Sequence, residues 1–174
     1  MGKHGELTAE IGKSLKIEGC DVFYDHGASS ENVGKIVSTI EKEYGREDEL
    51  SQLDIAIVER ISNKVVALIE IEETTDRPKT FLGDIFGVLF GEHISFKGKE
   101  LRIGDFTTLI VVRLSKAHHE KRNQYILDKV KKVKATLGTK NSAIGRVVIE
   151  TFSDEMELST RLPSMLDRAF KGEL

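Results

Sequence analysis

Two hydrophobic periodicities divide the chain into expected strands and expected helices. Short apolar runs rich in β-branched residues, each bounded by polar segments, predict strands over residues 52–59, 64–72, 107–114 and 146–152. The run over 107–114 is almost entirely apolar, which is typical of a strand buried on both faces. Residues 21–26 form a shorter apolar run that fits either a strand or a loop packed on the core.

Apolar residues spaced three and four positions apart predict the helices. The segments with this spacing are residues 7–17, 30–44, 80–90, 115–137 and 157–170. The second of them has Val33, Val37, Ile40 and Tyr44 at helical spacing, a serine pair that can cap its start, and Gly45 that can end it. After the third helix, residues 92–105 predict a loop with room for a short hairpin.

The order of these segments predicts an α/β fold with a central mixed sheet flanked by helices. A length of 174 residues suits one domain with a proper core, and the chain has only two prolines and no low-complexity linker. We therefore expect a single domain over residues 1–174. With 39% hydrophobic and 32% charged residues, the composition is that of a globular rather than a disordered protein.

Composition argues against several classes of function. No apolar run is long enough to cross a bilayer and no hydrophobic leader follows the first residues, so we expect a cytoplasmic protein without membrane contact. The single cysteine, Cys20, excludes an internal disulfide and a zinc site built from several cysteines. A net charge of −3 gives no sign of general nucleic-acid affinity. The positions of the basic residues therefore matter more than their sum.

Three acidic residues lie on the two expected strands 52–59 and 64–72. Glu70 and Glu72 are near the end of the second strand, where alternation places both side chains on one face. A hairpin between the strands would bring Asp54 beside them. Carboxylates that converge in this way repel one another unless a divalent cation holds them, and oxygen ligands suit Mg²⁺. The spacing therefore predicts a metal-dependent phosphoryl-transfer site.

A purely structural reading of these acids stays open. Glu72 and its neighbour Glu73 fit the solvated end of a strand, and Asp54 between apolar residues fits a turn residue or a hydrogen-bonded anchor. A lone acid on a strand more often has such a role than that of a ligand. We favour the metal site because spacing, side-chain parity and strand order agree for all three residues.

Acids on consecutive central strands resemble the PD-(D/E)xK nuclease superfamily. In that family an Asp begins the second core strand, and an acid followed two residues later by a lysine lies on the third. Asp54 and Glu70 match the two acids, but Glu72 stands at the lysine position. A minority of type II restriction endonucleases, including the enzyme that cuts GGATCC, carry this E-x-E variant. The similarity covers residues 52–114, about a third of the chain, and its further matching positions are Asp76, Arg77, Asp84 and Arg113.

The resemblance implies a restriction-endonuclease-like fold and a Mg²⁺-dependent endonuclease that hydrolyses DNA. It implies that Asp54, Glu70 and the carbonyl of Ile71 bind the metal, and that Glu72 is a general base or a ligand of a second metal ion. Cleavage of both strands would need two active sites, hence a homodimer with twofold symmetry. The long helix ending at residue 137 or the last helix would supply its interface.

Further positions are weaker candidates for the same site. Lys79, at the start of the next helix, is the nearest lysine that would restore the missing cation. Lys97, Lys99 and Arg102 form a basic loop of the kind that contacts phosphates or base edges near catalytic strands. Glu43 is a candidate for the acid that many related folds carry on the first core helix. Lysines 129–134 are better explained as the solvated face of an amphipathic helix.

Other functions remain as alternatives. The missing lysine and the acidic net charge fit a non-catalytic DNA-binding or interaction module on the same fold. A DNA repair or junction nuclease is a second option within the nuclease class, and a metal-dependent enzyme acting on small phosphorylated substrates is a third. The sequence specifies no recognition site and does not separate duplex from branched DNA or RNA.

Overall fold

A computed structural model describes residues 3–27, 30–40, 49–73, 78–115, 120–137, 144–171 and 173, without the side chains of 3, 4, 78–81 and 137. In chain order, the helices and strands are α1 Lys3–Ser14, β1 Cys20–Tyr24, β2 Ile36–Thr39, β3 Glu49–Leu53, β4 Ile55–Glu59, β5 Val65–Glu72, α2 Pro78–Leu89, β6 His93–Phe96, β7 Lys99–Arg102, β8 Thr108–Leu114, α3 Glu120–Leu137, β9 Arg146–Phe152 and α4 Glu155–Phe170. No helix in these ranges is long and apolar enough to cross a membrane.

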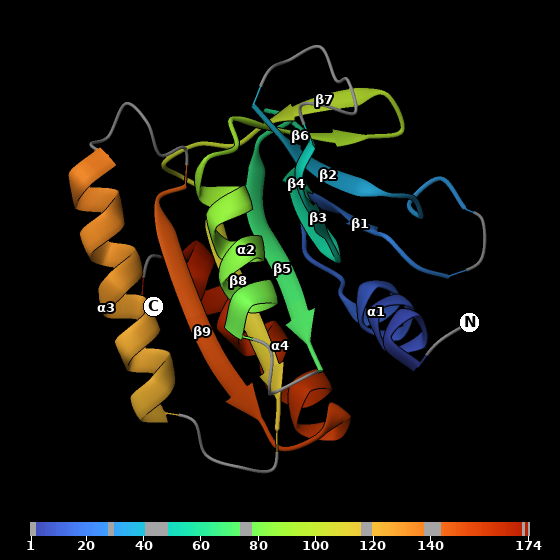
Figure 1. Ribbon diagram of the computed structural model, residues 1–174. Helices are drawn as coiled ribbons and strands as arrows, with labels where there is room; N and C mark the ends of the chain where they lie inside the picture. The colour runs from blue at the N-terminus through green and yellow to red at the C-terminus, as the bar shows by residue number, and fades with distance from the viewer. Residues whose placement is uncertain are drawn as a thin grey trace.

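The larger of two sheets has five strands in the order β1-β4-β5-β8-β9 (Figure 1). Strands β1, β4 and β5 pair antiparallel, whereas β5, β8 and β9 pair parallel. The parallel pairs are linked through α2 and α3, which provide the long crossovers that parallel strands require. The predicted α/β fold with a mixed sheet is therefore confirmed.

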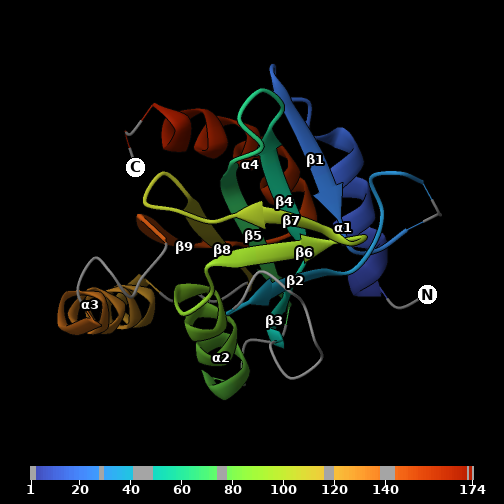
Figure 2. The same ribbon diagram turned by 90° about the horizontal axis from the view of Figure 1, so that it is seen from above.

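Helices and the smaller sheet cover the two faces of this five-stranded sheet. Helices α1 and α4 pack on one face, against the apolar side chains that include Ile57, Ile69 and Val112. Helices α2 and α3 and the smaller sheet pack on the other face, against Leu68 and Val111 among others (Figures 1 and 2). Strands β5 and β8 are thus covered on both sides, which explains their continuous apolar sequence.

The smaller sheet is antiparallel and has the strand order β3-β2-β6-β7. Its β6–β7 hairpin occupies residues that were expected to be a loop with room for a hairpin. The turn is made by Lys97 and Gly98, both with positive φ, 49° and 74°. Two such residues in a row match the twist of an antiparallel hairpin.

The predicted helix over residues 30–44 is wrong. Residues 36–39 form strand β2, which pairs with β3 on one side and β6 on the other, while residues 41–48 lie outside the described ranges. All four residues of β2 are buried. Helical spacing and a short apolar run are not distinguishable over four residues, and here the β-branched Ile36, Val37 and Thr39 follow the strand preference.

The predicted strand over residues 52–59 is divided at Asp54. Residues before it belong to β3 in the smaller sheet, and residues after it belong to β4 in the larger sheet. Leu53 packs in the core cluster below α2 and α3, whereas Ile55 packs in the cluster below α1 and α4. The chain therefore passes from one sheet to the other within a single residue.

The other predicted elements are present with small changes in their bounds. Helix α1 starts before the predicted residue 7, α2 starts at Pro78, and α3 is described from Glu120 because residues 116–119 lie outside the described ranges. Strand β9 has the predicted bounds. The run 21–26, left open between strand and loop, is mostly strand β1.

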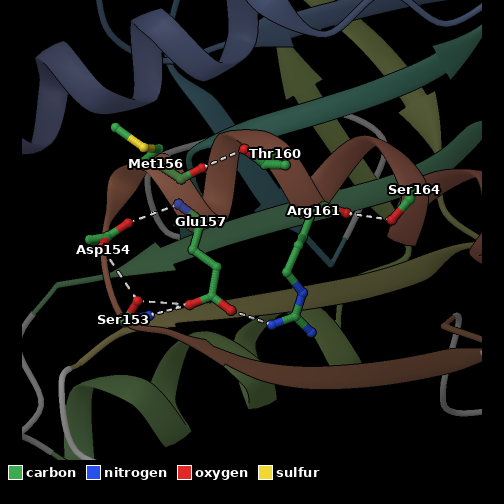
Figure 3. A network of polar contacts seen from close by, with 7 residues as sticks. All are labelled: Ser153, Asp154, Met156, Glu157, Thr160, Arg161 and Ser164. Atoms are coloured by element: carbon green, nitrogen blue, oxygen red, sulfur yellow. Dashed lines mark hydrogen bonds and ion pairs between the residues drawn. The ribbon is translucent and has the colours of Figure 1, made fainter.

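The start of α4 is fixed by a closed set of polar contacts (Figure 3). The Asp154 carboxylate accepts a hydrogen bond from the Glu157 N–H at 2.8 Å. In return, the Glu157 carboxylate accepts from the Ser153 N–H and hydroxyl and from Arg161. This arrangement resembles a capping box but is shifted by one residue, because Glu157 binds Ser153 before the N-cap Asp154. The bond from Glu157 to Asp154 satisfies one of the donors that the first helical turn leaves without partners.

We expect Glu157→Gln to lower stability at neutral pH and to lose this effect in acid. The Ser153 N–H, Arg161 and the Ser153 hydroxyl lower the pKa of Glu157 from its ordinary 4.5 to about 2. A depressed pKa contributes stability above the unfolded value, and this contribution is lost as the pH falls from about 4.5 to about 2. Thermal unfolding from pH 7 to pH 2 measures it. Glu155→Gln, in the same turn, is the control and should show little pH-dependent difference from wild type.

Candidate functional site

Asp54 is held in place where the chain changes sheets. Its side chain is buried, with 4% exposed. Oδ2 accepts a hydrogen bond from the Ile71 N–H at 2.8 Å, and Oδ1 accepts one from the Thr8 hydroxyl at 3.3 Å. Its backbone carbonyl accepts from the Asp25 N–H at 2.9 Å. Strands β1 and β5 and helix α1 therefore fix this acid together, which fits the hydrogen-bonded anchor that the sequence left open.

Glu70 and Glu72 lie on one face of β5, at the carboxyl end of the strand. Leu68, two residues earlier on that face, belongs to the cluster under α2 and α3, whereas Ile69 and Ile71 belong to the opposite cluster. The Glu70 carboxylate accepts a hydrogen bond from the backbone N–H of Asp54. Its Oε2 is buried, and no described residue donates a hydrogen bond to it. A buried carboxylate oxygen without a donor is costly, so the site is incompletely satisfied.

Asp84 joins these acids from helix α2. The resemblance matched this residue by its position in the expected helix. Burial, together with the charges of Glu72 and Asp54, raises the pKa of Asp84 from 3.8 to about 6. Asp84 therefore lies close enough to Glu72 and Asp54 to interact with their charges. The structure brings an acid of α2 to the strand acids.

The pKa of Glu70 is also raised by its surroundings. Burial raises its pKa well above the ordinary 4.5, with the charges of Asp54, Asp84 and Glu72 acting in the same direction. The hydrogen bond from the Asp54 N–H opposes this effect without cancelling it. Four carboxylates thus interact at one end of β5, and the name acidic cluster is used below for Asp54, Glu70, Glu72 and Asp84.

The carboxylate oxygens of the acidic cluster are suitable ligands for a hard cation. All are oxygens, the preference of Mg²⁺. The backbone N–H and carbonyl of one strand residue point to the same side of the strand. Because the Ile71 N–H donates to Asp54, the Ile71 carbonyl also lies on the Asp54 side of β5. Within the described ranges, no three Asp, Glu, His or Cys side chains stand as a ready set of metal ligands.

The basic loop predicted to contact substrate lies at the other end of β5. Arg102 forms a bridge with Lys64, which immediately precedes β5, whereas Glu70 and Glu72 are at its carboxyl end. Roughly 25 Å of strand separates the two groups. Lys97 donates from Nζ to the Ser30 carbonyl at 2.5 Å, so it also closes the hairpin onto a neighbouring loop. Lys99 and Arg102 are exposed. The hairpin is therefore not adjacent to the acids.

Lys79 and Glu43 were the remaining candidates for the site. Lys79 lies in the first turn of α2, but its side chain is outside what the structure describes. Glu43 lies outside the described residues, in the range 41–48. The helix on which Glu43 was expected is replaced by β2 over residues 36–39, so the reason for choosing it no longer holds.

Sequence reasoning missed a polar network beside the acidic cluster. Arg113 on β8 is 3% exposed and donates from Nη1 to Asn123 Oδ1 of α3 at 2.8 Å. Asn123 then donates from Nδ2 to the Thr151 hydroxyl of β9 at 2.8 Å. The sequence signal was an arginine ending an otherwise apolar strand. A charged residue in that position needs partners, but a sequence does not say which.

Comparisons with protein families, with curated proteins and with solved structures give no match to this chain.

Proposed function

We propose that this protein is a Mg²⁺-dependent endonuclease that hydrolyses DNA, with a restriction-endonuclease-like fold. The observation that carries the proposal is the acidic cluster at the carboxyl end of β5, where Glu70 Oε2 is buried and receives no hydrogen bond from any described residue. Four mutually repelling carboxylates destabilise a protein unless a cation or bound protons compensate them. Such an arrangement is retained more readily for function than for stability.

The topology supports the same proposal. In chain order, β4 is the second strand of the five-stranded sheet and β5 is the third. Asp54 immediately precedes β4, and Glu70 and Glu72 lie on β5. This is the placement of acids that the PD-(D/E)xK resemblance implies. The mixed sheet with helices on both faces also agrees with it.

Each acid has a distinct role in the proposed reaction. Asp54 and Glu70, with the Ile71 carbonyl, would hold Mg²⁺, which polarises a phosphodiester and acidifies a bound water. Glu72 would accept a proton from the attacking water or help hold a second ion. Asp84, with its pKa of about 6, would hold a proton below that pH and exist as a carboxylate above it.

The first turn of α3 carries two basic residues near Arg113, which pairs with Glu72 in the sheet. Arg122 is close enough to Arg113 to lower its pKa, and Lys121 beside it is exposed. We propose that these two residues, rather than the β6–β7 hairpin, contact the phosphates next to the scissile bond. The hairpin would then contact DNA farther along. A homodimer would place two acidic clusters on the two strands of a duplex.

A plasmid cleavage assay tests the function. Purified protein with millimolar Mg²⁺ or Mn²⁺ should cleave supercoiled DNA, whereas Glu70→Gln and Asp54→Asn should each reduce the rate by on the order of a thousandfold. Asparagine keeps an acceptor for the Ile71 N–H, so the fold is disturbed little. Glu10→Gln, an exposed acid of α1, is the matched control and should leave the rate unchanged.

Two outcomes would contradict the proposal. Failure to cleave duplex, methylated and branched DNA with either metal would remove the nuclease function. Cleavage that survives both substitutions would place the reaction elsewhere in the chain.

One observation favours a non-catalytic module as the second candidate. Both Asp54 carboxylate oxygens already accept hydrogen bonds from Ile71 and Thr8, so the acid serves the fold without a metal. In that case the acidic cluster would bind no divalent cation. DNA binding without cleavage, unaffected by Mg²⁺ and by Glu70→Gln, would be the result expected of it.

A further inference from the structure

Arg113 lies next to Glu72 in the sheet. The parallel register of β5 and β8 pairs Glu72 with Arg113, and that of β8 and β9 pairs Arg113 with Thr151. Registered residues of neighbouring strands project to the same face. Val111, two residues before Arg113, packs in the cluster below α2 and α3, which identifies that face. Glu72, Arg113 and Thr151 therefore form one row across the carboxyl ends of three strands.

The side chain that accepts a hydrogen bond from Arg113 in α3 is neutral. Guanidinium groups only donate, so the amide of Asn123 turns its oxygen to Arg113 and its nitrogen to the Thr151 hydroxyl. Both partners are neutral. An aspartate at position 123 would have closed a local ion pair, but the chain has asparagine there. Asn123 therefore fixes the position of the Arg113 guanidinium and adds no negative charge beside it.

Glu72 is the acid whose charge acts on Arg113. Burial lowers the pKa of Arg113, Arg122 lowers it further, and the negative charge of Glu72 raises it. A buried cation with a second cation nearby needs an anion to remain favourable. The row across the sheet supplies Glu72 for that purpose. At the same time it supplies a positive charge next to the position where the resemblance expects a lysine.

We propose that Arg113, anchored by Asn123 and Thr151, is the positioning residue of the acidic cluster and holds the Glu72 carboxylate in place. Only 3% exposed, Arg113 cannot reach a substrate and acts through Glu72. The role of Glu72 at a metal site rests on the proposed function. The pairing of Arg113 with Glu72 can be judged without any cleavage.

A double-mutant cycle on the metal-free protein tests the pairing. Arg113→Met, Glu72→Gln and the double variant are unfolded with urea at pH 7.5. If Arg113 acts on Glu72, Arg113→Met should raise the unfolding equilibrium constant by roughly tenfold or more in wild type and clearly less in Glu72→Gln. Equal effects in both backgrounds would overturn the proposal, because a residue that serves only Asn123 gives additive changes. Arg146→Met, an arginine at the other end of β9, is the control and should be additive with Glu72→Gln.

A conservative variant keeps the test decisive if Arg113→Met does not fold. Arg113→Lys retains the charge but not the planar group that contacts Asn123. It should keep most of the coupling to Glu72. Loss of all coupling in Arg113→Lys would mean that the hydrogen bond to Asn123, not the charge, is what the residue provides, and would overturn the proposal.

Calorimetric titration with Mn²⁺ tests the positioning. Asn123→Ala leaves every charge in place and removes the hydrogen bond that anchors Arg113 to α3, so it should weaken Mn²⁺ binding by about tenfold, as changes behind metal ligands usually do. The exposed neighbour variant Gln124→Ala should bind as wild type. Unchanged Mn²⁺ affinity in Asn123→Ala would overturn the positioning role. Absence of Mn²⁺ binding by wild type would instead contradict the proposed function, and the Arg113–Glu72 pairing would be judged by the cycle alone.

Discussion

Replacing Glu70 with glutamine should make the metal-free protein more stable and abolish its response to Mg²⁺. The pKa of the Glu70 carboxyl is raised by burial and by three neighbouring acids, so its ionised form is unfavourable in the folded protein. Glutamine cannot ionise, and its amide can donate hydrogen bonds to the neighbouring acids. We expect the melting temperature at pH 7.5 to rise by several degrees. In wild type, a hundredfold excess of Mg²⁺ over its Kd should stabilise by about 2.7 kcal/mol, or about 5–10 °C.

Differential scanning calorimetry with and without Mg²⁺ measures both effects. Glu150→Gln is the matched control, because Glu150 pairs with Val112, whose side chain packs on the opposite face of the same sheet. It should neither stabilise the protein nor change the Mg²⁺ response. A destabilised Glu70→Gln together with a wild type that ignores Mg²⁺ would show that Glu70 is a structural acid.

The metal-free protein should lose stability as the pH rises from about 4 to above 6. Asp84 has its pKa raised to about 6 by burial and by Glu72 and Asp54, and Glu70 is raised well above its usual value. Groups with a raised pKa bind protons more tightly when folded, so their stabilisation is complete below the unfolded value of about 4 and is lost through the folded value. We expect a loss of about 1–2 kcal/mol between pH 4 and pH 7, or about 3–6 °C.

Melting curves in the presence of a chelator, taken across this range, test the effect. Asp84→Asn should flatten the profile around pH 6 and leave the acid side unchanged, where Glu157 acts in the opposite direction. Millimolar Mg²⁺ should restore stability more at pH 7.5 than at pH 5, because the raised pKa of Glu70 makes this ligand hold its proton more at the lower pH. A profile that is flat in wild type, or equally steep in Asp84→Asn, would contradict the assignment.

Strands and helices with long, regular patterns were predictable from the sequence. The segments of β5, β8 and β9 are mostly apolar because other elements cover both faces of the larger sheet. Burial on both faces selects apolar residues at successive positions, which can be recognised in the sequence. The helix predicted over 30–44 failed because four buried β-branched and polar residues carry no periodicity of their own. Their strand conformation comes from pairing with β3 and β6. Neither partner is adjacent to β2 in the sequence, so the local pattern of residues does not reveal the pairing.

The acids were predictable as candidates, but their surroundings were not. Parity placed Glu70 and Glu72 on one face, and the strand order put Asp54 near them. Nothing local indicated that Asp54 would be the residue at which the chain changes sheets. Nor did any pattern connect Asn123 to Arg113, because that contact joins a helix to a strand through a single amide.

The passage between the sheets at Asp54 limits where the length of this chain can change. Leu53 and Ile55 are almost fully buried in two different clusters, with one residue between them. Adding or removing a residue there would turn every side chain of β3 or β4 to the wrong face. The turn at Lys97 and Gly98 is far from this point and closes only a hairpin at a sheet edge. Insertions are therefore tolerable in the hairpin and not beside the acids, so homologues of different length should differ at the first place and agree at the second.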